Sequence, residues 1–310
     1  MRDIFAKVGA WSEGGRLFSL ATLVGVRNAA PAPLGTSMAV TEEGVIAGDI
    51  GGGCYEGEII EAAMATARDG VARVLAIDLS GDDVLLGGSG CGGVLDVVTW
   101  RPPADFHDLA NEIVAGRSDV TWIIDYERDG RARQFTMKIP KRRELIVVGA
   151  TILAQELALI AKRLDFSTVV VDPRAIFATP ERLGAVDRIV IAWPQQALPA
   201  MLDATTPLVV VSHDPKIDLP ALREGVTSES PYIGLLGSRR AQRARRAALR
   251  AEGFNDATLA RIHGPAGLDI GGTTSAETAV SIIAEIVATG RERSGIPLVR
   301  HEGAIHTIAR

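Results

Sequence analysis

Continuous apolar runs, separated by helical stretches, dominate the second half of this chain. The runs lie at residues 145–148, 168–171, 189–192, 208–212 and 232–236. Runs that are apolar at every position, rather than at alternate positions, are expected for strands buried on both faces of a parallel sheet. The segment between the first two runs contains apolar residues at helical spacing, namely Leu153, Leu157, Ile160 and Leu164. The pattern predicts a doubly wound α/β domain over residues 144–292.

The closing helix of this domain has a clear start signal. Thr274 and Glu277 form a capping box, in which each side chain accepts a hydrogen bond from the other residue's backbone amide. Apolar residues then follow at helical spacing up to Ile286. Beyond it, residues 293–310 are expected to form a loosely ordered tail.

The first half of the chain predicts a mixed α+β domain over residues 1–140. Expected strands lie at 17–26, 36–40, 44–50, 71–79 and 94–100, expected helices at 56–68 and 106–114, and an expected hairpin at 121–126 and 132–138. A polar, proline-led segment, 140–143, separates this domain from the next. At 310 residues the chain exceeds what one hydrophobic core usually organises, so two domains are expected.

Composition excludes several classes of protein. A formal net charge of −5 argues against a general nucleic-acid binder. No apolar run approaches the roughly 18 residues of a membrane helix. The first residues show no secretory signal, so we expect a cytoplasmic protein. The two cysteines cannot form a disulfide framework, and both are expected to be free thiols.

Both cysteines sit in glycine-rich segments. Cys54 follows Gly52 and Gly53 and precedes Glu56, where a strand is expected to turn into a helix, and Cys91 has glycines on both sides. A helix N-terminus lowers the pKa of a thiol, so Cys54 is a candidate thiolate. The alternative is a small buried apolar residue, and for Cys91 the two interpretations are evenly balanced. Two thiols are too few for a closed zinc site.

The first strand and helix of the second domain resemble a dinucleotide-binding unit with an altered glycine pattern. Gly149-Ala150-Thr151 follows the strand, and Asp172 comes about 20 residues later, where such units bind a ribose. Thr151 replaces the glycine that lets the backbone approach a pyrophosphate. If the turn requires positive φ there, the strain would be about 1–2 kcal/mol, and affinity would fall roughly tenfold. The ligand is therefore an ordinary nicotinamide dinucleotide, a different phosphate-bearing molecule, or none.

Polar residues also follow the other strands of the predicted sheet. These are Arg174 after the second strand, His213 and Asp214 after the fourth, and Ser238 and Arg239 after the fifth. Ligands bind at the carboxyl ends of the strands in open α/β sheets, so these residues are candidates for binding. The alternative is that Asp and Ser only cap the following helices. The His213–Asp214 pair favours a ligand more strongly, because it is titratable.

Two further features could bind a partner or a ligand. Arg239, Arg243, Arg246 and Arg250 share one face of an expected helix, which is either a solvated face or a site for an acidic partner or phosphate. His263 and Asp269 flank a glycine- and proline-containing segment, which could close over a ligand or form a tight structural turn.

Taken together, the motifs resemble the XdhC/CoxI family, the xanthine dehydrogenase accessory proteins that mature molybdenum hydroxylases. The matching segments, spread over nearly the whole chain, are 52–57, 90–93, 171–174, 177–180, 212–216, 232–234, 237–240 and 267–271. The resemblance implies a Rossmann-like second domain. It also implies a maturation chaperone, rather than an enzyme, that binds the molybdenum cofactor in its molybdopterin or cytosine dinucleotide form. Such a chaperone would protect the cofactor, assist its sulfuration with a cysteine desulfurase, and pass it to the large subunit of an apo molybdenum hydroxylase.

The resemblance also implies a set of cofactor-binding residues and a homodimer. The residues are Gly52, Gly53, Cys54, Glu56, Cys91, Gly149, Thr151, Asp172, Arg174, His213, Asp214, Ser238, Arg239 and Asp269. Cys54 and Cys91 could ligate molybdenum through soft sulfur, or carry a persulfide during sulfur transfer. The chain departs from the family pattern at Thr151, at Ala32 in place of an arginine, and at Ser275 in place of a proline.

Two rival functions use the same residues differently. One is an NAD(P)-dependent oxidoreductase that uses the Rossmann-like domain, with His213 as its acid. The other is a scaffold that binds partners through the arginine-rich helix.

Overall fold

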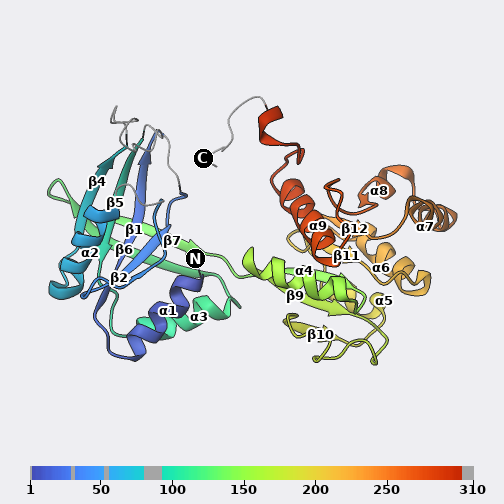
Figure 1. Cartoon of the computed structure of the whole chain (residues 1–310), viewed down its shortest axis with the longest axis horizontal. Helices are drawn as coiled ribbons and strands as arrows, with labels where there is room; N and C mark the ends of the chain where they lie inside the picture. The colour runs from blue at the N-terminus through green and yellow to red at the C-terminus, as the bar shows by residue number, and fades with distance from the viewer. Residues whose placement is uncertain (1, 29–31, 52–55, 80–92, 302–310) are drawn as a thin grey trace. The chain divides into compact units, whose positions relative to one another are not determined.

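The computed structural model describes residues 2–28, 32–51, 56–79 and 93–301 (Figure 1). The chain divides into two compact units, the first ending at Lys141 and the second beginning at Arg142. In the described residues, no helix has the length and apolar character needed to cross a membrane.

The first unit is built on a five-stranded antiparallel sheet of order β3-β2-β1-β5-β4. Its strands are β1 (Phe18–Arg27), β2 (Ser37–Thr41), β3 (Ile46–Ala47), β4 (Arg73–Asp78) and β5 (Val94–Trp100). The unit also contains α1 (Arg2–Glu13), α2 (Glu56–Asp69), α3 (Phe106–Ala115) and the hairpin β6 (Val120–Arg128) and β7 (Arg131–Ile139). The expected strand at 44–50 shortens to β3, and α1 was not expected.

Both faces of this sheet are buried. On one face, Leu23 and Val97 pack with Ile59 of α2. On the other face, Leu20 and Val98 pack with residues of α1, α3 and the β6–β7 hairpin. Neighbouring residues of β1 therefore point into different cores, as the alternation of a strand requires.

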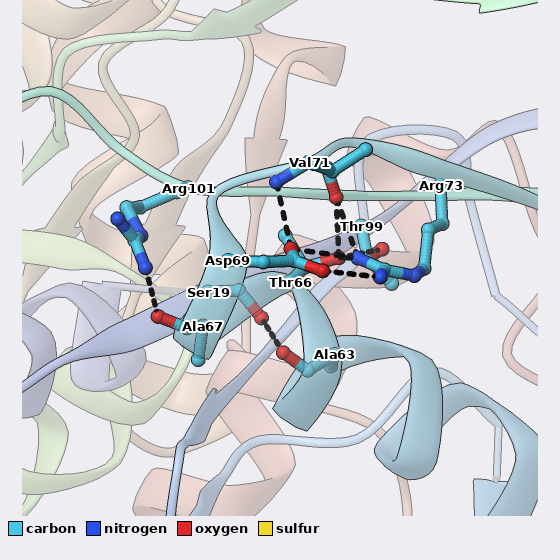
Figure 2. Close-up of polar contacts among 9 residues, drawn as sticks. All are labelled: Ser19, Ala63, Thr66, Ala67, Asp69, Val71, Arg73, Thr99 and Arg101. Atoms are coloured by element: carbon cyan, nitrogen blue, oxygen red, sulfur yellow. Dashed lines mark hydrogen bonds and ion pairs between the residues drawn. The ribbon is translucent and has the colours of Figure 1, made fainter.

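Polar contacts fix the C-terminal half of α2 to the sheet (Figure 2). The Thr66 hydroxyl lies 2.7 Å from the Thr99 hydroxyl of β5 and donates to the Val71 carbonyl at 2.9 Å. Ser19 of β1 donates to the Ala63 carbonyl at 2.7 Å. This end of α2 therefore lies beside the start of β1 and the end of β5. Its N-terminus, at Glu56, points toward the opposite end of the sheet.

The second unit is a six-stranded parallel sheet of order β10-β9-β8-β11-β12-β13. Its strands are β8 (Arg143–Val148), β9 (Phe166–Val171), β10 (Arg188–Val190), β11 (Leu208–Val210), β12 (Ile233–Leu235) and β13 (Ile262–His263). Numbered within this sheet, the order is 3-2-1-4-5-6, which is the order of dinucleotide-binding folds. The predicted Rossmann-like fold is confirmed, with β13 as an additional short strand.

Helices cover both faces of the parallel sheet. They are α4 (Ile152–Arg163), α5 (Pro194–Ala197), α6 (Pro215–Thr227), α7 (Arg239–Ala251), α8 (Asp256–Ala260) and α9 (Ser275–Gly290), with short 3-10 turns η2 (Leu198–Ala200) and η3 (Leu298–Arg300). Leu157 of α4 and Ile282 of α9 pack on one face. Ile217 of α6 and Leu249 of α7 pack on the other. The capping box of Thr274 and Glu277 at the start of α9 is present as predicted.

Replacing Thr66 by valine is expected to destabilise the first unit by about 1–3 kcal/mol, because buried hydrogen-bonding partners lose their contact while the volume hardly changes. Urea unfolding measures this difference. Thr121→Val, at an exposed position of β6, is the matched control, with an expected change within about 0.5 kcal/mol. Equal effects of the two substitutions would show that the α2 contacts do not stabilise the unit.

Candidate functional site

A cleft of ≈500 Å³ opens at the carboxyl ends of β8 and β11. These adjacent strands are the first and fourth of the sheet, so the strand order reverses between them, and open α/β sheets bind ligands at such a point. The cleft is lined by Ala150, Thr151, Ile152, Leu153, Arg174, Phe177, Arg182, Ser212, His213, Leu236, Thr273, Thr274, Ser275 and Thr278. Hydroxyl groups and cationic side chains make up most of its polar lining.

The turn after β8 is tight because two backbones approach closely. Gly149 has φ +117°, and a Cβ atom there would lie 2.7 Å from the Ser212 Cα. Thr151 has an extended backbone, with φ −115°, and its side chain accepts a hydrogen bond from the Ala154 amide at 3.3 Å. The positive φ falls on Gly149, so the strain expected at Thr151 is absent. Thr151 instead caps α4.

Two helices begin beside the cleft, and they differ in charge. The first turn of α4 contains no acidic residue. At the start of α9, Glu277 accepts hydrogen bonds from the amides of Thr273 at 2.8 Å and Thr274 at 2.9 Å, and these bonds lower its pKa to about 2. A carboxylate therefore already occupies the positive end of α9. The N-terminus of α4 is the one that favours an anionic ligand.

Asp172 is fully buried and makes several internal hydrogen bonds. It accepts from the Ala150 amide at 2.7 Å, and from the Arg174 Nε and Nη2 atoms at 2.9 and 2.8 Å. Burial by itself would raise the pKa of Asp172, but the bonds from Arg174 and from backbone amides lower it overall. The same contact raises the pKa of Arg174. Asp172 thus joins the turn after β8 to the loop after β9, and its contact with a ribose stays a prediction.

Phe177 and Arg182 complete this side of the cleft. The guanidinium carbon of Arg174 lies 4.9 Å from the centre of the Phe177 ring, and that of Arg182 lies 5.5 Å from it. Phe177 and Arg182 were not among the predicted site residues. The segment 177–180 matched the family motif, which is a signal that could have drawn attention to Phe177, whereas Arg182 lies just beyond it.

His213 has a left-handed backbone, with φ +60°. Its carbonyl accepts a hydrogen bond from Arg245 at 3.3 Å. Arg245 forms a buried ion pair with Asp218, at 2.5 Å, and Asp218 accepts a hydrogen bond of 2.5 Å from the Ser212 hydroxyl. This buried network holds the turn that places His213 at the cleft.

Asp214 and Ser238 cap helices. Asp214 accepts from the Lys216 amide at 2.9 Å, at the start of α6. Ser238 accepts from the Ala241 amide at 3.3 Å, at the start of α7. Neither residue lines the cleft, and neither does Arg239, which is exposed at the start of α7. Ligand contacts from these three residues stay predictions.

Part of the arginine-rich helix serves the fold. Arg245 points inward to Asp218, and Arg246 donates to the carbonyls of Leu259 and Ile262 at 2.6 Å each. Arg250 pairs with Asp256 at 2.7 Å. The guanidinium groups of these three arginines thus bind neighbouring elements of the fold, and a partner site on α7 stays a prediction.

The segment between His263 and Asp269 is anchored by Glu285 of α9. The Glu285 carboxylate accepts from the Tyr232 hydroxyl at 2.6 Å and the Gly267 amide at 2.7 Å, and lies 3.0 Å from His263 Nδ1. Burial favours the neutral acid, but these donors lower the pKa of Glu285 overall. Burial also raises the pKa of Tyr232. Asp269 is exposed and does not line the cleft.

Gly52, Gly53, Cys54 and Cys91 lie outside the described residues. Glu56, the first residue of α2, accepts a hydrogen bond from the Ile50 amide at 3.2 Å. Within the described part of the chain, no group of three or more His, Cys, Asp or Glu residues could hold a metal ion. Molybdenum ligation by the two thiols therefore stays a prediction.

Comparison with protein families gives two matches. Residues 145–286 match the family described as "XdhC Rossmann domain". Residues 11–78 match the family described as "XdhC and CoxI family". This chain belongs to the XdhC/CoxI family. The first match spans the parallel sheet and the cleft, and the second includes the Gly-Cys segment around Cys54.

Several proteins are similar to this XdhC/CoxI chain. A probable xanthine dehydrogenase subunit of Bacillus subtilis is 26% identical, over 87% of this chain and 92% of its own length. The molybdenum cofactor insertion chaperone PaoD of Escherichia coli is 23% identical, over 87% of this chain and 82% of its own length. The uncharacterized protein YqeB of Escherichia coli is 25% identical over 94% of this chain, which spans 47% of that protein.

A solved structure shares the fold of this XdhC/CoxI chain. The crystal structure of a xanthine dehydrogenase from Bacillus halodurans superposes with a TM-score of 0.76, at 22% identity. The match covers 95% of this chain and 97% of the other.

Because His213 has a left-handed backbone, His213→Gly is expected to be more stable than His213→Ala by about 1 kcal/mol. Urea unfolding of the two variants measures the difference. The same pair of substitutions at Arg243, an exposed position in the interior of α7, is the control, and there glycine is expected to be less stable than alanine by about 1 kcal/mol. If alanine were the more stable residue at both positions, the backbone strain at His213 would be refuted.

Glu285→Gln is expected to lower the free energy of unfolding of the second unit at neutral pH. The difference from wild type is expected to become smaller at acid pH. The folded-state pKa of Glu285 is lowered, so its contribution is present above the ordinary carboxyl range and is lost as the pH falls through the folded value. Urea unfolding of wild type and variant from pH 7 to pH 3 measures the difference. Tyr232→Phe removes one donor and is expected to reduce this pH dependence. A difference that grows toward acid pH would contradict the assignment.

Proposed function

We propose that this chain binds the molybdenum cofactor, protects it, and passes it to the large subunit of an apo molybdenum hydroxylase. Membership of the XdhC/CoxI family and similarity to PaoD, a molybdenum cofactor insertion chaperone, support this role. The structural observation that carries the proposal is the cleft at the β8–β11 switch point, because its donors suit an anionic ligand. The cofactor form is molybdopterin or its cytosine dinucleotide.

The polar groups of the cleft fit a phosphate-bearing cofactor. Thr151, Ser275 and Thr278 bring hydroxyl groups, and the start of α4 brings backbone amides without an acidic neighbour in its first turn. The nearby carboxylates of Asp172 and Glu277 already accept several internal hydrogen bonds. The cleft thus presents mainly donors, which is the requirement for holding a phosphate.

The rival function, an NAD(P)-dependent oxidoreductase, rests on the strand order of the second unit. Nicotinamide enzymes of this fold use an acidic residue after the second strand to bind the ribose hydroxyls. Here that residue is Asp172, and Arg174 already engages both of its oxygens. This contact favours the chaperone role over the oxidoreductase.

The frame of the first unit supports a joint role for Cys54 and Cys91. At one end of the sheet, Arg27 of β1 and Asp78 of β4 both pair with Val94 of β5. The N-terminus of α2 points toward this end, and Ile50 and Leu79 pack in one apolar cluster. The described residues that flank the two cysteine segments therefore gather at this end of the unit. We propose that the two thiols act on one ligand.

The remaining partners follow from the family role. We propose that a cysteine desulfurase supplies sulfur for the cofactor, with Cys54 or Cys91 carrying it as a persulfide. We also propose that the chain works as a cytoplasmic homodimer.

The protein purified from cells that make the cofactor is expected to retain a stoichiometric pterin, measured by fluorescence after oxidation. Cys54→Ala is expected to lower the retained amount about tenfold or more, because a soft-metal ligand is lost. Cys91→Ala, and the variant carrying both substitutions, show whether the thiols act together. If they share a ligand, the double variant loses little more than either single variant.

Titration with NADH and NADPH, followed by fluorescence, is the control for the rival function. Absence of pterin from the wild-type protein, together with micromolar binding of either nucleotide, would overturn the chaperone role in favour of the oxidoreductase.

A further inference from the structure

One wall of the cleft is a cationic cluster around an aromatic ring. Arg174 and Arg182 place their guanidinium carbons 4.9 and 5.5 Å from the centre of the Phe177 ring. All three side chains come from the loop between β9 and β10, and all three line the cleft. A guanidinium group within about 6 Å of a ring centre is attracted to the ring. Phe177 therefore restrains both arginines at the cleft.

The two arginines differ in what they bind. Arg174 is joined to the buried Asp172 by two hydrogen bonds, of 2.9 and 2.8 Å. Arg182 is exposed, and no ion pair to it occurs within the described part of the chain. Arg182 thus brings a positive charge that pairs with no carboxylate of the described residues, since the adjacent Glu181 carboxylate is hydrogen-bonded to Thr179.

The other carboxylates near the cleft have internal partners. Asp218 binds Arg245 and Ser212, Asp214 caps α6, and Glu277 caps α9. None of these groups pairs with Arg182, and each is already engaged in the fold. The loop after β9 therefore presents the hydrogen-bond donors of Arg174 and Arg182 to the cleft. In a nicotinamide-binding fold, an acidic residue at this place accepts hydrogen bonds from the ribose hydroxyls.

We propose that Arg182, with Arg174 beside it on the Phe177 ring, forms a subsite for a phosphate group of the ligand. Arg174, whose charge Asp172 offsets, lies against the same ring and adds a hydrogen-bond donor group, and Arg182 makes the direct contact. The guanidinium fork matches a phosphate in geometry and charge. This inference rests on the proposed function, and it makes the cleft selective for a phosphate ester over an unphosphorylated nucleoside.

The test is calorimetric titration of the full chain with inorganic pyrophosphate, CDP and cytidine. Wild type is expected to bind pyrophosphate and CDP, and to bind cytidine at least about tenfold more weakly, because charge-assisted hydrogen bonds are lost. Added salt is expected to weaken the binding of both anions.

Variants assign the contact to Arg182. Arg182→Gln is expected to lower the affinity for CDP and pyrophosphate about tenfold, and Arg182→Lys to recover part of it. Phe177→Leu is expected to lower the affinities for CDP and pyrophosphate about two- to fivefold, because the guanidinium groups lose the aromatic ring that restrains them. Arg240→Gln makes the same charge change on the exposed surface of α7 and is expected to leave affinity unchanged.

The outcomes separate this subsite from the proposed function. Undiminished binding of pyrophosphate to Arg182→Gln, or equal loss with Arg240→Gln, would overturn the subsite, as would failure of wild type to bind either anion. If the purified protein retains pterin while Arg182→Gln binds CDP normally, only the subsite is wrong. If no pterin is retained but CDP binding depends on Arg182, the subsite stands and the chaperone role falls. Circular dichroism and thermal unfolding confirm that each variant is folded.

Discussion

The buried carboxylate of Asp172 is the contact on which the cleft depends. It binds the Ala150 amide of the turn after β8 and the guanidinium of Arg174 in the loop after β9. A buried anion is costly unless it is paired and hydrogen-bonded, so the two loops must keep their positions for Asp172 to remain charged. The same carboxylate shapes the cleft, and Arg174 already engages both of its oxygens. A residue recognised from its place after a strand thus has a structural role of its own.

The parallel sheet could be predicted because its signal is local. Uninterrupted apolar runs mark the buried strands, and the capping box of Thr274 and Glu277 marks the start of α9. The helix α1 was missed, although Ile4, Phe5 and Val8 show an apolar helical face. β13 has only two residues, which is too short for a periodic pattern.

The site was harder to predict because its roles depend on partners distant in sequence. His213 and Asp172 were recognised from their places after strands, and the structure puts the first at the cleft and the second beneath it. Asp218 is 27 positions from Arg245, so no local sequence pattern predicts their ion pair. A strip of arginines looks the same in a sequence whether it faces water or a neighbouring carboxylate. Only packing distinguishes the two.

The β4–β5 pair of the first unit has a consequence for how the family can vary. The Leu79 amide bonds to the Gly93 carbonyl at 2.7 Å, so the strand pair closes before residues 80–92 begin. Ile50 and Glu56 are likewise joined by a hydrogen bond on either side of residues 52–55. Hydrogen bonds thus hold the described ends of both cysteine segments, so sequence changes within a segment leave its attachment points to the first unit in place.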